Sequence, residues 1–423
     1  MPLTSFTVSS ISQTLHINSV TLEPMKNLLS LLVLLLLTLT QAQTVITYWH
    51  SQDATEDLIQ SFADEFNASQ DQYEVVPEYA GNYQESWIKL AAALGTPKAP
   101  AIFDAEITVF PRLVEEGGAA DLSDLTATLA EDLVAEIFPA LWDYGEFDGV
   151  RYGLPWNMSM PTLFYNASVF EKLGVEPPTT WEAFEEAADR LTTRNTRGYI
   201  DVAAPITFET LVASRGGSLI TEDGQPNFDS PEAVDALSML QRMAKARNSI
   251  PRGATELDQA LVDFARTKAM MAIASEALFP QGERFSVAFD IAAAPIPSGG
   301  SQVVPLTGAQ FTVLAGASAE QQQGAFAFWQ YLMQPEMQVR WVQESYFLPV
   351  RRSVVDLLED WYAESPNRGV ALSQLEYAVN RPRVGAYVVW QSYLAEALER
   401  ATKGRGDPAE VLQEAQRRAL ESR

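Results

Sequence analysis

The chain has 423 residues, with 55 acidic against 29 basic side chains and a formal net charge of −26. A surface this acidic repels phosphate backbones and anionic membranes, which argues against nucleic-acid binding. The chain has no cysteine, so disulfides, cysteine-ligated zinc, iron–sulfur clusters and thiol catalysis are excluded together.

The first 42 residues predict an export signal. Met25–Lys26–Asn27 is a short positive start, Leu28–Leu39 is a largely apolar run of 12 residues, and Thr40–Gln41–Ala42 is a small-residue cleavage site. A membrane-spanning helix needs about 20 apolar residues, so we expect a signal peptide and no anchor. Residues 1–24 are polar, and we expect the natural start at Met25, the alternative being a long n-region. Without a cysteine to carry lipid, the mature protein is expected to be free in a periplasm.

Beyond this segment, strand patterns alternate with helix patterns. The length suggests two or three domains. The alternation predicts an α/β protein with parallel-rich sheets covered by helices. Strands are predicted at Val45–Trp49, Tyr73–Tyr79, Ala101–Ala105, Thr162–Tyr165, Ala269–Ala274, Asp290–Pro295 and Phe311–Ala315.

Between these strands, apolar residues recur at helical spacing and predict core-facing stripes. Thr179 and Glu182 have capping-box spacing before one of these helices, and Ser230 with Pro231 predicts the start of another. The C-terminal residues, 384–423, are also predicted to be helical and amphipathic. The stripes are Leu58, Ile59, Phe62 and Phe66; Trp181, Phe184, Ala188 and Leu191; Val234, Leu237, Leu240 and Met243; and Tyr387, Trp390, Leu394 and Leu398.

Three segments rich in Pro or Gly are candidates for places where the chain passes from one lobe to another. They are Gly153–Asn157, Pro305–Phe311 and Tyr346–Val350. Each alone could be an ordinary turn, but three crossings would join two lobes that are each built from discontinuous sequence.

Several local motifs, in their order along the chain, resemble those of the extracellular solute-binding proteins of ABC importers, family 1. The resemblance runs from about Thr44 to the C-terminus and is greatest to the glycerol-3-phosphate-binding members. The motifs are Tyr48–Trp–His–Ser51, Val76–Pro–Glu–Tyr–Ala–Gly–Asn–Tyr83, Pro155–Trp–Asn–Met–Ser–Met–Pro161 with its ending Tyr165–Asn166, Leu348–Pro349, and Arg383–Val–Gly385.

The resemblance implies a two-lobe periplasmic-binding-protein type II fold with three hinge crossings. Lobe 1 would comprise residues 44–154 plus 310–346, and lobe 2 residues 157–305 plus 350–423. Such a protein, expected to be a monomer, closes over a small solute and delivers it to the transmembrane subunits of a permease. No cofactor, metal or nucleic acid is implied. The expected cargo is a polyol phosphate, such as glycerol-3-phosphate or a glycerophosphodiester.

Carried over position by position, the resemblance implies ligand-binding residues along the whole chain. A guanidinium forks onto phosphate with two hydrogen bonds, which is the role expected of Arg383. A glycine, here Gly308, lets its backbone N–H approach a phosphate oxygen because no Cβ intervenes. The remaining candidates supply hydroxyl groups or, in one case, a carboxylate that accepts from solute hydroxyls: Tyr83, Ser159, Ser275, Tyr346 and Glu106.

The sequence also departs from the glycerol-phosphate pattern. Where those binders have a Trp-rich segment in the second lobe, this chain has Val202–Phe208, so Phe208 is the candidate replacement. Where they have Tyr before Leu-Pro, this chain has Phe347, with Tyr346 one position earlier. A sugar or oligosaccharide therefore stays open as the alternative solute.

Enzymatic alternatives have less in their favour. His50 is the one histidine after the signal segment, so a His-based metal site is not expected. A secreted glycoside hydrolase would need a pair of carboxylates at the appropriate separation, and no nucleophile or acid motif stands out among the many Asp and Glu residues. We expect a binding protein without catalytic activity.

Overall fold

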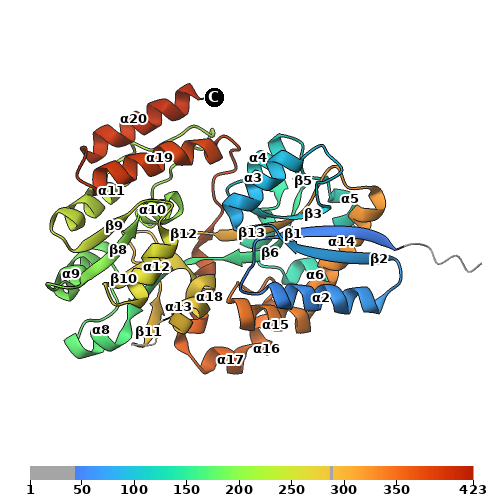
Figure 1. Cartoon of the computed structure of the whole chain (residues 1–423), viewed down its shortest axis with the longest axis horizontal. Coiled ribbons are helices and arrows are strands. Elements are labelled where there is room, and N and C mark those ends of the chain that lie inside the picture. Colours follow the sequence, from blue (N-terminus) through green and yellow to red (C-terminus); the bar gives the residue numbers. More distant parts are fainter. Residues whose placement is uncertain (1–42, 286–288, 423) are drawn as a thin grey trace, which may run out of the picture. The chain divides into compact units, whose positions relative to one another are not determined.

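Strands that lie far apart in the sequence build two five-stranded sheets in the computed structural model, which describes residues 43–285 and 289–422 (Figure 1). The predicted signal peptide, residues 1–42, lies outside the described residues. The first sheet has the order β2 (Tyr73–Tyr79), β1 (Thr44–His50), β3 (Ile102–Glu106), β13 (Thr307–Val313), β6 (Gly153–Ser159). The second has the order β11 (Ile291–Ala294), β7 (Pro161–Asn166), β10 (Ala269–Ser275), β8 (Arg197–Val202), β9 (Ser249–Arg252).

Both sheets are mixed, and their pairing decides which strand ends meet. β1 pairs parallel with β2 and β3, whereas β13 runs antiparallel to β3 and β6. The start of β13 therefore lies beside the ends of β3 and β6. In the second sheet β10 is antiparallel to β7 and pairs Ser275 with Pro161. The end of β10 thus lies beside the start of β7.

The chain passes from the first sheet to the second with only Met160 between β6 and β7. This change of sheet falls just after Gly153–Asn157, because those residues belong to strand β6 of the first sheet. The chain returns to the first sheet between β11 and β13, through the short strand β12 (Val304–Pro305), which pairs with β14 (Ala378–Val379). The division into two lobes, with its boundaries, stays a prediction.

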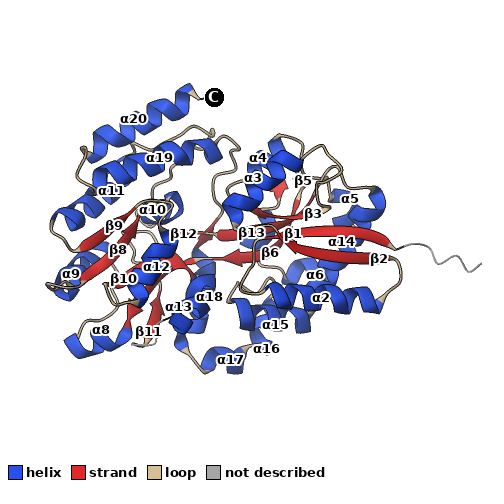
Figure 2. Ribbon diagram, viewed as in Figure 1, coloured by secondary structure: helices blue, strands red, loops and turns tan. Residues whose placement is uncertain are grey.

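Helices cover the sheets on their faces (Figure 2). Those in contact with the first sheet include α2 (Glu56–Ser69), α3 (Tyr83–Ala93), α7 (Pro139–Asp143) and α14 (Ala319–Leu332). Those in contact with the second include α8 (Ala167–Leu173), α9 (Trp181–Leu191), α11 (Pro231–Lys245), α12 (Leu257–Ala265) and α18 (Val370–Gln374). The pair β4 (Glu146–Phe147) and β5 (Val150–Arg151) forms a small hairpin.

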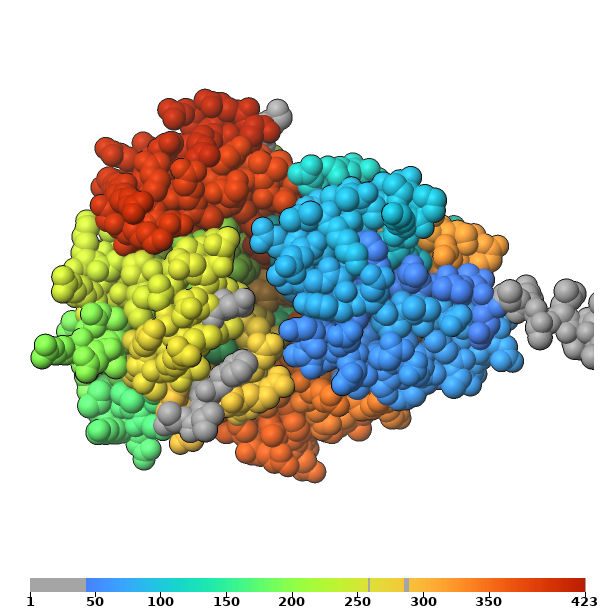
Figure 3. All heavy atoms as spheres, in the orientation of Figure 1, coloured from blue at the N-terminus to red at the C-terminus, as the bar shows by residue number. Residues whose placement is uncertain are grey.

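The remaining helices follow in chain order: α4 (Phe110–Glu115), α5 (Ser123–Thr126), α6 (Glu131–Glu136), α10 (Pro205–Ala213), α13 (Phe279–Phe285), α15 (Pro335–Ser345), α16 (Arg352–Leu357), α17 (Glu359–Ala363), α19 (Tyr387–Thr402) and α20 (Pro408–Glu421). The last two pack on each other and on α11, at the red end of the chain (Figure 3).

The predicted helical stripes face the core, which confirms the periodicity. Phe62, Phe184 and Leu237 are fully buried, as are Trp390 and Leu394 of α19. The core on the first sheet is rich in aromatic side chains, and residues of α14 and α15 pack into it.

One predicted cap is correct and one is wrong. Ser230 caps α11, its Oγ accepting from the backbone N–H of Ala233 at 3.3 Å. Helix α9, in contrast, is capped by Thr180, whose Oγ1 accepts from Ala183 N at 3.2 Å. The predicted capping residue, Thr179, is instead bound through its backbone carbonyl, which accepts from Ser298 N at 2.9 Å. Because the helix starts one residue later than predicted, the capping-box spacing does not apply.

No helix among residues 43–285 and 289–422 is both long enough and apolar enough to span a lipid bilayer.

Candidate functional site

Glu106 ends strand β3 beside the start of β13. It pairs with Ala309, and the next residue, Ile107, donates its backbone N–H to Gly308 O at 3.0 Å. The Glu106 carboxylate accepts from Thr108 N at 2.9 Å and Thr108 Oγ1 at 2.8 Å. Burial raises the pKa of Glu106, although the neighbouring Arg381 lowers it. The carboxylate is therefore held by local hydrogen bonds in a mostly buried position.

The two candidate serines meet where the two sheets join. Ser159 ends β6 and is fully buried, and Ser275 ends β10. Ser275 Oγ donates to Ser159 Oγ at 3.0 Å, and Thr307 at the start of β13 pairs with Ser159. The strand order therefore brings Glu106, Ser159 and Ser275 to the same strand ends. Each serine hydroxyl also satisfies the other, so the contact has a structural role as well.

Gly308 lies between these strand ends in a conformation that suits only glycine. Its φ is +110°, and it pairs with Met158 of β6. A Cβ at this position would overlap the carbonyl oxygen of Asn157 and stand 3.0 Å from Met158 Cα. The close approach of the two strands thus explains this glycine, and a role for its N–H toward a ligand stays a prediction.

Tyr83 opens helix α3, which the side chain of Asn82 caps by accepting from Gln84 N and Glu85 N at 3.0 Å each. The Tyr83 hydroxyl accepts from Gln52 Nε2 at 2.7 Å. Burial, with the nearby charges of Asp104 and Glu106, raises the pKa of Tyr83, so the phenol stays neutral. The phenol is close enough to feel the Glu106 charge.

Asp104, two residues before Glu106, is a core group. It is fully buried and accepts from Tyr48 Oη at 2.8 Å and from Asn157 Nδ2 at 2.6 Å. Burial raises the pKa of Asp104 to about 8, against hydrogen bonds that lower it. A proton on Asp104 near neutral pH follows from this environment.

Arg383 lies apart from the strand ends. Its side chain is exposed and donates from Nη1 to Glu146 O at 2.6 Å and from Nη2 to Asp143 O at 2.7 Å. The guanidinium also lies 5.7 Å from the ring centre of Tyr144, whose hydroxyl donates to Ile107 O. Arg383 therefore contacts the loop around the β4–β5 hairpin, and its role toward a ligand stays a prediction.

Tyr346 lies close to Phe279 and Glu276, which follow the end of β10. It ends helix α15 with a φ of +57°, and its ring stacks on Phe279 at 5.9 Å and meets Trp361 edge-on at 5.1 Å. Burial raises the pKa of Tyr346. The structure places this ring in an aromatic cluster, and binding of a ligand by its hydroxyl stays a prediction.

Sequence reasoning missed two charged residues beside Glu106. Arg381 is 3% exposed and Glu209 is 6% exposed, and they form an ion pair with Nη2 to Oε2 at 2.7 Å. One signal was available for Glu209, because a lone acidic residue interrupts the apolar run of helix α10. For Arg381 the signal was ambiguous, since Arg381–Pro382–Arg383 offers two guanidinium groups and the family motif matches the second.

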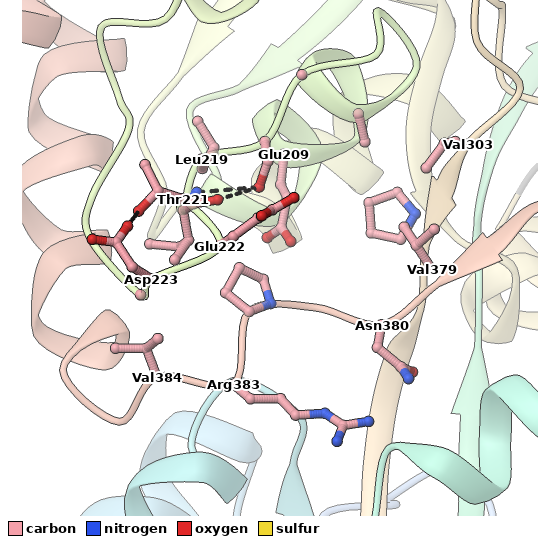
Figure 4. Close-up of a pocket in the computed structure, with 17 residues that line it drawn as sticks. Glu209, Leu219, Thr221, Glu222, Asp223, Val303, Val379, Asn380, Arg383 and Val384 are labelled. Atoms are coloured by element: carbon pink, nitrogen blue, oxygen red, sulfur yellow. Dashed lines mark hydrogen bonds between the residues drawn. The ribbon is translucent and has the colours of Figure 1, made fainter.

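A cavity of about 670 Å³ lies next to this ion pair (Figure 4). Its walls come from α10, the loop at Gly217–Gly224, the β12–β14 pair and the segment after β14. The charged residues among its lining are Glu209, Glu222, Asp223 and Arg383. The lining therefore carries more negative than positive charge.

Residues 61–370 match the family of bacterial extracellular solute-binding proteins, and the chain belongs to that family. It is 25% identical to the sn-glycerol-3-phosphate-binding periplasmic protein UgpB of Escherichia coli strain K12, over 88% of this chain and 91% of that protein. It is 26% identical to the protein of the same name from Yersinia pseudotuberculosis, over 88% of this chain and 90% of the relative.

Solved structures show the same fold. UgpB from Mycobacterium tuberculosis in complex with glycerophosphocholine is similar with a TM-score of 0.80 at 21% identity, covering 90% of this chain and 98% of that one. The ABC substrate-binding protein Lmo0181 from Listeria monocytogenes in complex with cycloalternan also has a TM-score of 0.80 at 21% identity, covering 90% and 99%.

The predicted family and the α/β periplasmic-binding-protein fold are thereby confirmed. The protein is a solute-binding protein of the ABC-importer class, and its family and relatives are binding proteins rather than enzymes. Proteins of this class bind small solutes and deliver them to a permease.

Proposed function

We propose that this protein captures a polyol phosphate, such as glycerol-3-phosphate or a glycerophosphodiester, in the periplasm and delivers it to the permease of an ABC importer without chemical turnover. The observation that carries the proposal is the likeness to the glycerol-3-phosphate-binding proteins, which extends over 88% of this chain and 91% of the relative.

The geometry supports a solute with several hydroxyl groups. Ser159, Ser275 and the Glu106 carboxylate meet at the strand ends, and Tyr83 lies within electrostatic reach of Glu106. A carboxylate accepts from hydroxyl groups and the serines both donate and accept. Each such bond contributes on the order of 1 kcal/mol, and about twice that where one partner is charged.

Arg383 is the proposed partner of the phosphate. It lines the cavity, and a guanidinium has five N–H donors, of which the carbonyls of Glu146 and Asp143 engage two. Donors therefore remain for a phosphate oxygen. The proposed site thus extends from the strand ends along Glu209 to Arg383.

A neutral sugar or oligosaccharide is the second candidate, and the charge of the cavity favours it. Glu209, Glu222 and Asp223 outnumber Arg383 along the cavity wall, so the field there opposes an anion unless Arg383 is close to it. Structural neighbours at 21–23% identity hold cycloalternan and tagatose as well as glycerophosphocholine.

Titration calorimetry with sn-glycerol-3-phosphate, glycerophosphocholine and a panel of neutral sugars tests the proposal. We expect a dissociation constant between about 1 nM and 1 μM for a polyol phosphate, or roughly −12 to −8 kcal/mol. Arg383→Gln should weaken phosphate binding by 10-fold or more while leaving any sugar binding unchanged. Arg405→Gln, at an exposed arginine outside the cavity, is the matched control.

Heat with sugars and none with either phosphate would instead establish the second candidate. Release of chromophore from chromogenic glycosides would refute a pure binding role.

A further inference from the structure

The side chain of Arg381 lies between two carboxylates that come from different parts of the fold. Its Nε and Nη2 donate to Glu209 Oε2 at 3.0 and 2.7 Å, and its Nη1 donates to Thr108 Oγ1 at 2.6 Å. Nη1 also reaches Glu106 Oε1 at 3.4 Å. Glu106 ends a strand of the first sheet, whereas Glu209 is in α10, which packs against α11 and α19. One guanidinium thus joins two otherwise separate elements.

The surroundings of this triad, defined as Glu106, Arg381 and Glu209, contain no second cation at bonding distance among the described residues. Tyr387 of α19 donates from Oη to Glu209 Oε2 at 3.3 Å. The neutral phenols of Tyr144 and, on the Glu106 side, Tyr83 are the other titratable groups that face it. The triad therefore carries a net charge of −1 when all three groups are ionised.

The Glu106 and Glu209 carboxylates need the Arg381 guanidinium to stay ionised side by side. Two carboxylates that share a poorly solvated site cannot both ionise without a cation, and one of them then takes up a proton. Burial alone would lower the pKa of Arg381, but the charges of Glu209 and Glu106 outweigh burial and raise it, so the cation persists at any physiological pH. A phosphate gains little from a guanidinium that two carboxylates already neutralise.

We propose that Arg381 is a specificity-determining positioning residue of the solute site, which holds the Glu106 and Glu209 carboxylates side by side as acceptors for hydroxyl groups of the solute. This role of Arg381 rests on the proposed function in one respect, namely that a polyol solute occupies the site beside Glu106. Glu209 lines the cavity, and its Oε1 makes none of the hydrogen bonds found for this side chain, so it is available to a solute hydroxyl. The polyol end of the solute lies against the triad, and its phosphate lies away from it.

Three variants separate positioning from simple structural support. Arg381→Met keeps the length of the side chain and removes its charge, so the two carboxylates would carry −2 if both were ionised, and one of them takes up a proton. The double variant Arg381→Met with Glu209→Gln carries −1 with the Glu106 carboxylate ionised and has no like charge that would protonate it. Arg381→Lys keeps the charge and loses the forked geometry.

The experiment measures glycerophosphocholine affinity by calorimetry between pH 6.5 and 8.5, where the phosphodiester itself does not titrate. The unmodified protein sets the reference pH profile, which includes any effect of Asp104, whose pKa burial raises to about 8. Arg381→Met should bind at least 10-fold more weakly at pH 7 and recover as the pH rises, because the protonated carboxylate ionises again. The double variant should return to within about 5-fold of the unmodified protein and follow the same pH profile, and Arg381→Lys should be weaker by the same factor at every pH.

A measurement on the solute-free protein tests the positioning role of Arg381 separately from the proposed capture of a polyol phosphate. The buried Glu276 also has a raised pKa, so NMR of ¹³C-labelled glutamate carboxyls should show one group titrating above pH 7 in Arg381→Met in addition to those of the unmodified protein, and no such added group in the double variant. If the unmodified protein binds no polyol phosphate, the proposed function fails while the NMR result still decides whether Arg381 holds both carboxylates ionised. The positioning role would be overturned if Arg381→Met bound glycerophosphocholine as tightly as the unmodified protein. It would also be overturned if Arg381→Met lost affinity by the same factor at every pH and the double variant did not recover it.

Discussion

Gly308→Ala is the substitution for which the structure gives the most definite expectation, and Gly300→Ala is its matched control. The two glycines have nearly the same positive φ, +110° and +106°. They differ in their surroundings: a Cβ at Gly308 would overlap the carbonyl oxygen of Asn157, whereas a Cβ at Gly300 would meet nothing within 4 Å.

The cost of backbone strain at a positive φ can therefore be separated from the cost of steric overlap by the added methyl group. An alanine in such a conformation costs on the order of 1–3 kcal/mol at either position. At Gly308 the added methyl also forces β13 away from β6, and overpacking of this kind costs roughly 1–3 kcal/mol more. The ladder bonds beside it, including Ile107 N to Gly308 O, contribute about 1 kcal/mol each. We expect Gly308→Ala to be less stable than Gly300→Ala by about 2 kcal/mol.

Urea unfolding followed by tryptophan fluorescence measures this difference. With a slope above about 3 kcal/mol per molar for a chain of this size, the two midpoints should differ by about 0.6 M. Equal midpoints would show that strand β13 yields to a methyl group without cost. The close approach of β6 and β13 would then not be the reason for the glycine.

Three further predictions follow from buried side chains. Trp341 is fully buried and stacks on Trp156 at 4.6 Å and on Phe347 at 5.7 Å, so Trp341→Ala should lower the free energy of unfolding by about 3–5 kcal/mol in urea titrations. Burial lowers the pKa of His50 to about 4, so an NMR titration should find a neutral imidazole at pH 5.5. Because the unfolded chain takes up this proton near pH 6.5, up to about 3 kcal/mol of folding stability should be lost as the pH falls from 6.5 to 4. Burial raises the pKa of Asp201 to about 7, so this group costs the fold stability progressively as the pH rises from about 4 to 7. Asp201→Asn should therefore raise the free energy of unfolding by up to about 4 kcal/mol at pH 8 and by only about 1 kcal/mol at pH 4.5. A charged His50 at pH 5.5, or an Asp201→Asn gain that is the same at both pH values, would contradict these environments.

Much of the fold could be predicted from the sequence, because strand and helix periodicities are local. β1, β2 and β10 begin and end within one residue of the predicted bounds. The missed strand β8 contains Gly198 and the buried Asp201, which break the apolar run that identifies a strand. Strand β13 begins four residues before its predicted start, since Gly308 has a low strand preference and is held in the strand by pairing with β6.

The site could be predicted only where it depends on strand ends. Glu106, Ser159 and Ser275 end their strands, so the topology alone brings them together. The contact of Arg381 with Glu209 joins residues 172 positions apart, through a segment of irregular backbone and a helix. No local pattern indicates which of Arg381 and Arg383 points inward, because periodicity fixes side-chain direction only within helices and strands.

Hydrogen–deuterium exchange in the presence and absence of saturating sn-glycerol-3-phosphate tests most directly whether a polyol phosphate is captured at these strand ends. We expect slower exchange in peptides that cover Glu106–Thr108, the end of β10 at Ser275, and the segment from Arg381 to Tyr387. Unchanged exchange in all three, or protection confined to other parts of the chain, would contradict capture at this site.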